Sequence, residues 1–109
     1  MGWMKSSASD AVRTAVRFPL QLALHLKTEG GTVDAITHDI SSSGLLFSTP
    51  YLAKIGSVIE FTLDLPSDLM GWARGISIDC VGRVVRYQFA GQETMMAAEI
   101  EQYTLRAQL

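Results

Sequence analysis

Apolar side chains at every second position are the feature of this 109-residue chain that most constrains its fold. Four leucines, Leu20, Leu22, Leu24 and Leu26, alternate with mostly polar residues. This period of two is that of a β-strand with one buried face, because successive side chains of a strand point to opposite sides. The alternation recurs over residues 57–65. The core is therefore predicted to be built from strands.

Turn residues divide the chain into short strands. Glu29-Gly30-Gly31 indicates a hairpin that leads into a strand over 32–40, because glycine adopts the positive φ that tight turns need. Further strands are predicted over 44–48, 57–65, 76–87 and 93–100. Gly82 indicates a bulge or bend within the strand over 76–87. We therefore expect an all-β fold, a small six-stranded antiparallel β-barrel, since closure leaves no strand edge exposed.

The length of the chain predicts one domain over residues 1–109. Its expected parts are a mobile N-terminal arm at 1–18 with the arginine motif, the barrel at 19–100, and a C-terminal tail or short helix at 101–109. The single cysteine, Cys80, lies in an apolar run and is expected to be a buried hydrophobe in a reducing compartment. No apolar stretch has the length of a signal peptide or membrane span, so a cytoplasmic protein without membrane insertion is expected.

Composition argues against several classes of function. A formal net charge of -2 disfavours DNA, RNA and anionic membranes as partners, and the few aromatic residues disfavour a barrel that stacks single-stranded nucleic acid. Both histidines, His25 and His38, fall in strands and are expected to be ordinary surface residues. No cysteine or carboxylate cluster has metal-ligand spacing, and the serines at 41–43 lack a neighbouring base. We therefore expect no enzyme, no catalytic residue, no metal and no cofactor.

Two motifs are not explained by the strands, and the first is Arg13-Thr14-Ala15-Val16-Arg17. Ser9 or Asp10 could cap a short helix whose exposed face carries both arginines, with no ligand involved. Alternatively, two guanidinium groups on a lead-in segment could close over a ligand, because they pair with phosphate oxygens and with the O6 and N7 acceptors of guanine. The motif alone does not decide between these interpretations.

The second motif is Asp39-Ile40-Ser41-Ser42-Ser43-Gly44, at the junction of the second and third strands. It is typical of a turn, because Asp and Ser side chains bond to nearby backbone and glycine completes the bend. As a binding site, Asp39 would accept from the N1 and N2 donors of guanine, and Ser41 would bond the base or a phosphate. Gly44 would let the backbone approach closely.

The order of these features resembles the PilZ domain family: an arginine pair with three residues between, a leucine-alternating strand, a hairpin, then Asp-x-Ser-x-x-Gly. The resemblance covers residues 13–100 and includes the late stretch Gly82-Arg83-Val84-Val85-Arg86. PilZ domains are bacterial receptors for the second messenger cyclic di-GMP. The resemblance implies that this chain binds cyclic di-GMP, changes conformation and signals to an unidentified effector protein. The implied ligand-binding residues are Arg13, Arg17, Asp39, Ser41 and Gly44.

Three further interpretations accompany this resemblance. A nucleotide-independent interaction module of pilus or motility machinery is the alternative within the family. Many members carry a glycine near the start of the last strand, where this chain reads Thr94-Met95-Met96-Ala97-Ala98, so no site residue is assigned there. Val12 stands where a basic residue favours a stacked ligand pair, so one ligand per chain is expected.

Two surface features receive no ligand role at this stage. The loop 68–72, which contains Met70 and Trp72, either contacts the effector or plugs one end of the barrel. Arg83 and Arg86 are expected to be solvated strand residues.

Overall fold

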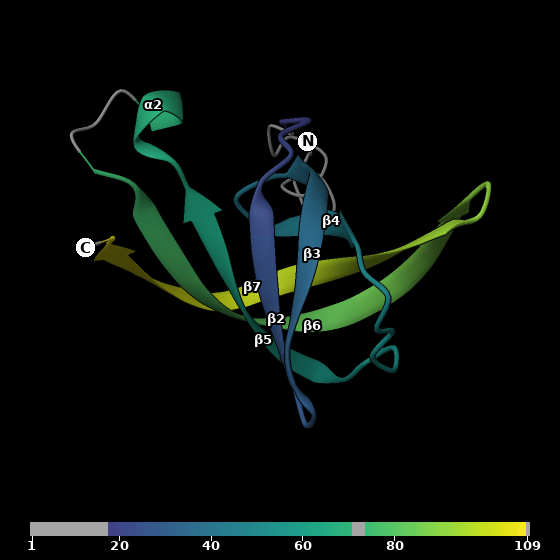
Figure 1. Ribbon diagram of the computed structural model, residues 1–109. Coiled ribbons are helices and arrows are strands. Elements are labelled where there is room, and N and C mark those ends of the chain that lie inside the picture. Colours follow the sequence, from purple (N-terminus) through teal and green to yellow (C-terminus); the bar gives the residue numbers. More distant parts are fainter. Residues whose placement is uncertain (1–17, 71–73, 109) are drawn as a thin grey trace, which may run out of the picture.

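The alternating segments of the sequence form strands in the computed structural model, which describes residues 18–70 and 74–108 (Figure 1). The strands are β2 (Ala23–Thr28), β3 (Gly31–Ile40), β4 (Gly44–Ser48), β5 (Val58–Leu65), β6 (Ile76–Ala90) and β7 (Glu93–Ala107). One short helix, α2 (Ser67–Met70), follows β5. No helix among the described residues is long and apolar enough to cross a lipid bilayer.

The six strands close into an antiparallel barrel with the order β2-β3-β4-β7-β6-β5. Pairing of β2 with β5, through Leu24↔Leu63 and Leu26↔Phe61, completes the ring. β6 and β7 form one long curved hairpin that extends past the shorter strands at both of its ends (Figure 1). The predicted small six-stranded antiparallel barrel is confirmed.

Inward-facing residues of these strands make the core. Leu24 and Leu26 are fully buried, and the rings of Phe47 and Phe61 pack with centroids 6.2 Å apart. Each such side chain contributes about 1.5–3 kcal/mol by leaving water. Cys80 is also buried, as predicted, and burial raises the pKa of its thiol to about 11.

Glycines stand where the sequence places the turn and the bend. Gly31 has a φ of 122° in the β2–β3 hairpin, which Thr28 closes by donating to the Gly31 carbonyl at 2.7 Å. The register of β6 against β7 shifts between Val81 and Gly82. A Cβ at Gly82 would lie 2.6 Å from the Glu99 carbonyl oxygen, so a side chain there would push the two strands apart.

The tail contradicts the predicted alternative of a short C-terminal helix. β7 continues through Ala107, with Tyr103 opposite Cys80 and Ala107 opposite Ile76. The barrel strand predicted to stop at residue 100 is therefore longer. The residues after 100 instead pair with the edge of β6. The ladder hydrogen bonds and cross-strand contacts formed there stabilise a strand, whereas an isolated helix of about two turns is only marginally stable.

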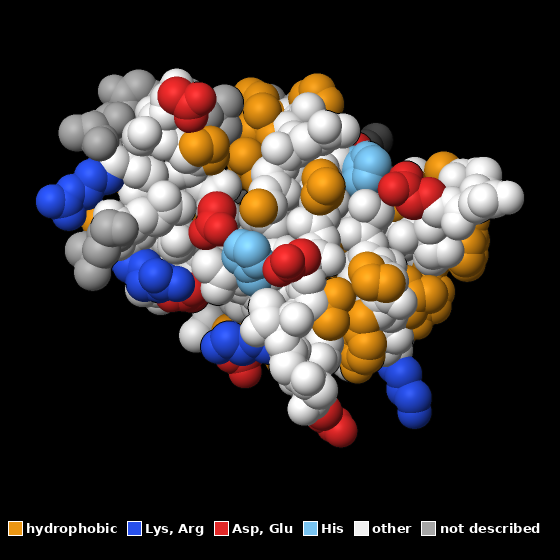
Figure 2. All heavy atoms as spheres, in the orientation of Figure 1, with side chains coloured by type: hydrophobic (Ala, Val, Ile, Leu, Met, Phe, Trp, Pro, Cys, Tyr) orange, Lys and Arg blue, Asp and Glu red, His pale blue; other side chains and the backbone are white. Residues whose placement is uncertain are grey.

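His25 has a structural role on the outer face that the sequence did not indicate. Its Nδ1 lies 2.9 Å from an Asp34 oxygen and its Nε2 lies 2.7 Å from an Asp64 oxygen, so it joins β2 to β3 and β5. Both nitrogens donate only when the ring is an imidazolium, because ionised carboxylates only accept. The bonds to Asp34 and then to Asp64 raise the pKa of His25 above its usual 6.5. Figure 2 shows histidine side chains flanked by carboxylates on this face.

The contacts of His25 with Asp34 and Asp64, called the His25 clamp below, predict a pH-dependent contribution to stability. Because the folded-state pKa is raised, the contribution is fully present below the unfolded value of 6.5 and is lost as pH rises through the folded pKa. His25→Ala should therefore cost more stability at about pH 5.5 than at about pH 9, by no more than about 1 kcal/mol for so exposed a pair. Urea unfolding of both proteins at the two pH values measures the difference.

His38→Ala is the matched control. The His38 Nε2 lies 3.8 Å from Glu93, beyond hydrogen-bond distance, so its loss should change stability less between the two pH values. An equal cost of His25→Ala at both pH values would contradict the clamp.

Candidate functional site

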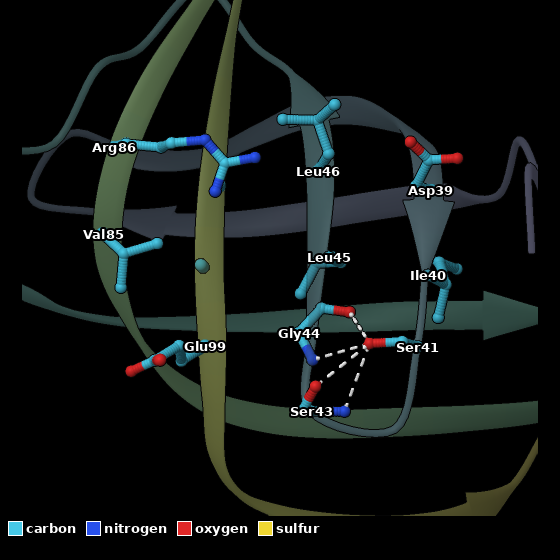
Figure 3. Close-up of a pocket in the computed structure, with 12 residues that line it drawn as sticks. Asp39, Ile40, Ser41, Ser43, Gly44, Leu45, Leu46, Val85, Arg86 and Glu99 are labelled. Atoms are coloured by element: carbon cyan, nitrogen blue, oxygen red, sulfur yellow. Dashed lines mark hydrogen bonds between the residues drawn. The ribbon is translucent and has the colours of Figure 1, made fainter. Parts of the chain in front are cut away.

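A pocket opens on the outside of the barrel beside the turn that joins β3 to β4 (Figure 3). Its lining comes from the end of β3, from β4, and from the middle of β6 and β7. Its cavity volume is about 130 Å³. Pockets that enclose a small ligand measure roughly 300–1,000 Å³. The described residues therefore form an open shelf on which a ligand could rest, rather than an enclosure.

One row of cross-strand neighbours runs along this shelf. Asp39 pairs with Leu46, Leu46 with Ala97, and Ala97 with Arg86. Residues directly opposite one another in antiparallel strands share a face, so the row sets an acid at one end and a base at the other. Neighbouring strands lie about 4.8 Å apart, which separates the backbones of Asp39 and Arg86 by about 14 Å. The floor between them is apolar.

Ser41 organises the turn beside this row. Its hydroxyl oxygen lies 3.2 Å from the amide nitrogen of Gly44 and 3.3 Å from that of Ser43, and both amides donate to it. The Ser41 amide donates to the Gly44 carbonyl at 2.8 Å. These bonds match the turn interpretation of the motif, and Figure 3 shows the bonds of the Ser41 hydroxyl group converging on its oxygen. Ser41 thus shapes the rim of the shelf.

Gly44 is required by the packing of β4 on β7. A Cβ at this position would lie 2.6 Å from the Ala98 carbonyl oxygen, closer than real contacts allow. The close backbone approach predicted for Gly44 is therefore an approach to β7. Glu99 is the partner of Gly44 in the β4–β7 ladder, and it also lines the pocket.

Asp39, Ser41 and Gly44 all line the pocket, so the structure brings these three predicted residues together. Arg13 and Arg17 lie outside the described residues. The chain is nevertheless fixed directly after them, because Phe18 and Ile40 exchange two backbone hydrogen bonds of 2.8 and 2.9 Å. Ile40 stands between Asp39 and Ser41. The arginine motif therefore ends one residue before a point anchored at the shelf.

Arg86 and β7 were missed as parts of the site. Arg86 reaches from β6 across β7 toward Leu46 (Figure 3), and no described residue pairs with its guanidinium. The register shifts at Val85, which places Arg86 opposite Ala97 on the outer face. A strict alternation would point Arg86 to the same inner face as the buried Val84, so the sequence pattern does not reveal this bulge. The lining also includes Ala97, Ala98 and Glu99, in the strand to which no site residue was assigned.

The charges of the shelf do not by themselves favour an anion. Asp39 and Glu99 line it as carboxylates, and Arg86 is its one described cation. Arg83, the other arginine of β6, donates to Glu101 at 3.0 Å and to the Gly56 carbonyl at 2.7 Å. An anionic ligand would therefore need further positive charge from elsewhere in the chain. No group of three or more metal-ligating side chains occurs within residues 18–70 and 74–108.

The loop considered as an effector contact or barrel plug is described only in part. Residues through Met70 form α2, and residues 71–73, which include Trp72, lie outside the described residues. Both interpretations of Trp72 remain predictions.

Comparisons with known proteins identify a family and a similar fold. A model of the PilZ domain family matches residues 11–106. The fold is similar to the solved structure of the Bacillus subtilis inhibitor of motility MotI/DgrA, with a TM-score of 0.73 and 17% sequence identity. The match covers 84% of this chain and 44% of that one, so the chain spans less than half of that neighbour. No curated protein matches the sequence.

Gly44→Ala tests the packing at the shelf. The added methyl group meets backbone of β7, so we expect a loss of about 1–3 kcal/mol in the free energy of unfolding. Gly30→Ala is the control, because its Cβ would meet nothing closer than the Thr28 hydroxyl at 4.0 Å. Chemical denaturation of the three proteins gives the comparison. Equal stability of both variants would contradict the close approach of β4 to β7.

Proposed function

The chain belongs to the PilZ domain family, and on this basis we propose that it is a receptor for cyclic di-GMP that signals through a protein partner. The observation that carries the proposal is the shelf at the β3–β4 turn, where Asp39, Ser41 and Gly44 meet beside Phe18, the anchored residue that follows the arginine motif in the sequence. PilZ domains are regulatory binding modules, and we propose binding without catalysis here.

Each group on the shelf suits one part of a cyclic dinucleotide of guanine. The Asp39 carboxylate has no hydrogen bond to a described residue, so it is available to accept from the N1 and N2 groups of a guanine base. Leu46 and Ala97 are apolar and line the pocket between Asp39 and Arg86, where the face of a purine could pack. The Arg86 guanidinium, at the far end of the row, can stack on a base or pair with a phosphate.

The arginine motif supplies what the shelf lacks. Two carboxylates against one guanidinium leave the described lining without the charge to hold two phosphates. Arg13 and Arg17 would add two guanidinium forks, which match both phosphate oxygens and the O6 and N7 acceptors of guanine. Phe18, the residue after Arg17 in the sequence, is hydrogen-bonded to Ile40 at the edge of the pocket, and this supports a role for the arginine motif at the shelf. We propose one ligand per chain, in line with the apolar Val12.

Signalling would follow from closure of the arginine segment over the ligand. A segment whose position depends on a bound ligand changes the surface that a partner protein meets. The effector is not identified. The structural neighbour is an inhibitor of motility, and motility control is one process in which such a receptor could act.

Calorimetric titration of cyclic di-GMP into the wild-type chain tests the proposal. We expect saturable binding with one ligand per chain, and none of cyclic di-AMP. Arg13→Ala and Arg17→Ala should each weaken binding by about a hundredfold or more, because each removes charge-assisted hydrogen bonds worth roughly 3 kcal/mol. Arg86→Ala should weaken it less, by about tenfold, if one such contact is lost.

Arg106→Ala is the matched control for loss of positive charge. Arg106 lies on β7 away from the pocket and pairs with Asp79, so its replacement should leave binding unchanged. Absence of heat and of ligand-induced stabilisation in the wild-type protein would reject the receptor function. That result would leave the nucleotide-independent interaction module as the remaining function within the family.

A further inference from the structure

The last part of β7, residues 101–107, has a strand neighbour on one side only. β7 pairs with β4 from Met95 to Glu99, and with β6 along its whole length to Ala107. The Ile100 amide donates to the Ser43 carbonyl at 2.9 Å. Beyond that bond, none of residues 18–70 or 74–108 pairs with the second edge of β7. Figure 1 shows this stretch extending past β4 toward the C-terminus.

The open edge carries exposed apolar side chains. Tyr103 is 63% exposed and Leu105 is 55% exposed. They stand two residues apart, opposite Cys80 and Ile78, and therefore share one face of the sheet. Proteins usually protect open edges with proline, lysine or unpaired charge. The stretch 101–107 contains no proline, lysine or glycine.

Both charged residues of this edge are already paired within the chain. Arg83 donates to Glu101 at 3.0 Å, and Arg106 donates to Asp79 at 2.7 Å. Each pair joins β7 to β6, on the side away from the open edge. The edge therefore presents little uncompensated charge to an approaching strand.

We propose that this edge is a dimer interface, at which β7 pairs antiparallel with β7 of a second copy of the chain. Symmetry makes the stretch complementary to itself. In a two-fold antiparallel pair, residues of the same parity lie opposite one another, because side chains and amides both alternate with a period of two. Every symmetric register consequently sets the Tyr103 and Leu105 face of one copy beside the same face of the other.

A register centred on Thr104 illustrates the fit. Tyr103 of each copy then lies opposite Leu105 of the other, an aromatic–aliphatic pair of the kind that stabilises sheets. On the opposite face Arg106 lies opposite Gln102, so no like charges meet. The paired edges would join two barrels through one continuous sheet.

The corresponding edge of β6, at the other end of the hairpin, is less suited to this role. Val84 is already bonded there, to the Gly56 amide at 2.7 Å and to the Ser57 carbonyl at 3.0 Å. The bulge at Val85 then interrupts the strand, and Arg86 turns to the shelf. The pairing of β7 with itself closes after two copies, whereas pairing of β7 with β6 would build an open chain of copies.

Sedimentation equilibrium on the full chain, without nucleotide, tests the interface. The molar mass of the wild-type protein should rise with concentration from 11.9 kDa toward twice that value and stop there. The double variant Tyr103→Lys and Leu105→Lys places lysine opposite lysine in the register centred on Thr104. It should raise the dissociation constant of the dimer at least about tenfold. Phe89→Lys, at a 71% exposed position near the hairpin turn, is the control and should dimerise as the wild type does.

Amide hydrogen exchange of the wild-type protein gives a second readout that needs no variant. Protection of residues 101–107 should increase with protein concentration, while protection at the β2–β3 hairpin should not. A monomer mass at all concentrations, unlimited growth beyond two copies, or equal dimerisation of the double variant would each overturn the interface. Because no nucleotide is present, these results are independent of cyclic di-GMP binding.

Discussion

The pairing of β4 with β7 is the interaction on which both the fold and the candidate site depend. It joins the sheet of β2, β3 and β4 to the long β6–β7 hairpin, and together with the β2–β5 pairing it closes the barrel. The same ladder carries the row from Asp39 through Leu46 and Ala97 to Arg86. Gly44 permits it, because a side chain there would strike the Ala98 carbonyl. A glycine of the Asp39–Gly44 motif is thus required by the packing of the barrel.

Local pattern was sufficient to predict most of the fold. Period-two alternation and turn glycines located all six strands, and Gly82 marked a real irregularity. The tail was harder, because residues after 100 have no strong local preference and take their conformation from the edge of β6. The clamp of His25 was also not predictable, since Asp34 and Asp64 reach it only through the barrel register.

The candidate site was also only partly predictable from local sequence patterns. Asp39, Ser41 and Gly44 form a local motif, so the sequence could place them together, and in the structure all three line one pocket. Arg86 belongs to the pocket because of a bulge at Val85, and bulges leave little trace in a single sequence. Arg13 and Arg17 lie outside the described residues, so their ligand role stays a prediction. It rests on the anchored Phe18 and on the charge that the shelf lacks.

Backbone amide NMR of the wild-type chain, recorded during titration with cyclic di-GMP, tests the central claim most directly. The account predicts that resonances of Ser41, Gly44, Arg86 and Ala98 shift with a common saturation curve, while those around His25 on the separate outer face stay in place. Shifts confined to residues away from the β3–β4 turn, or no shifts at saturating nucleotide, would contradict the claim that this shelf is a nucleotide-binding site.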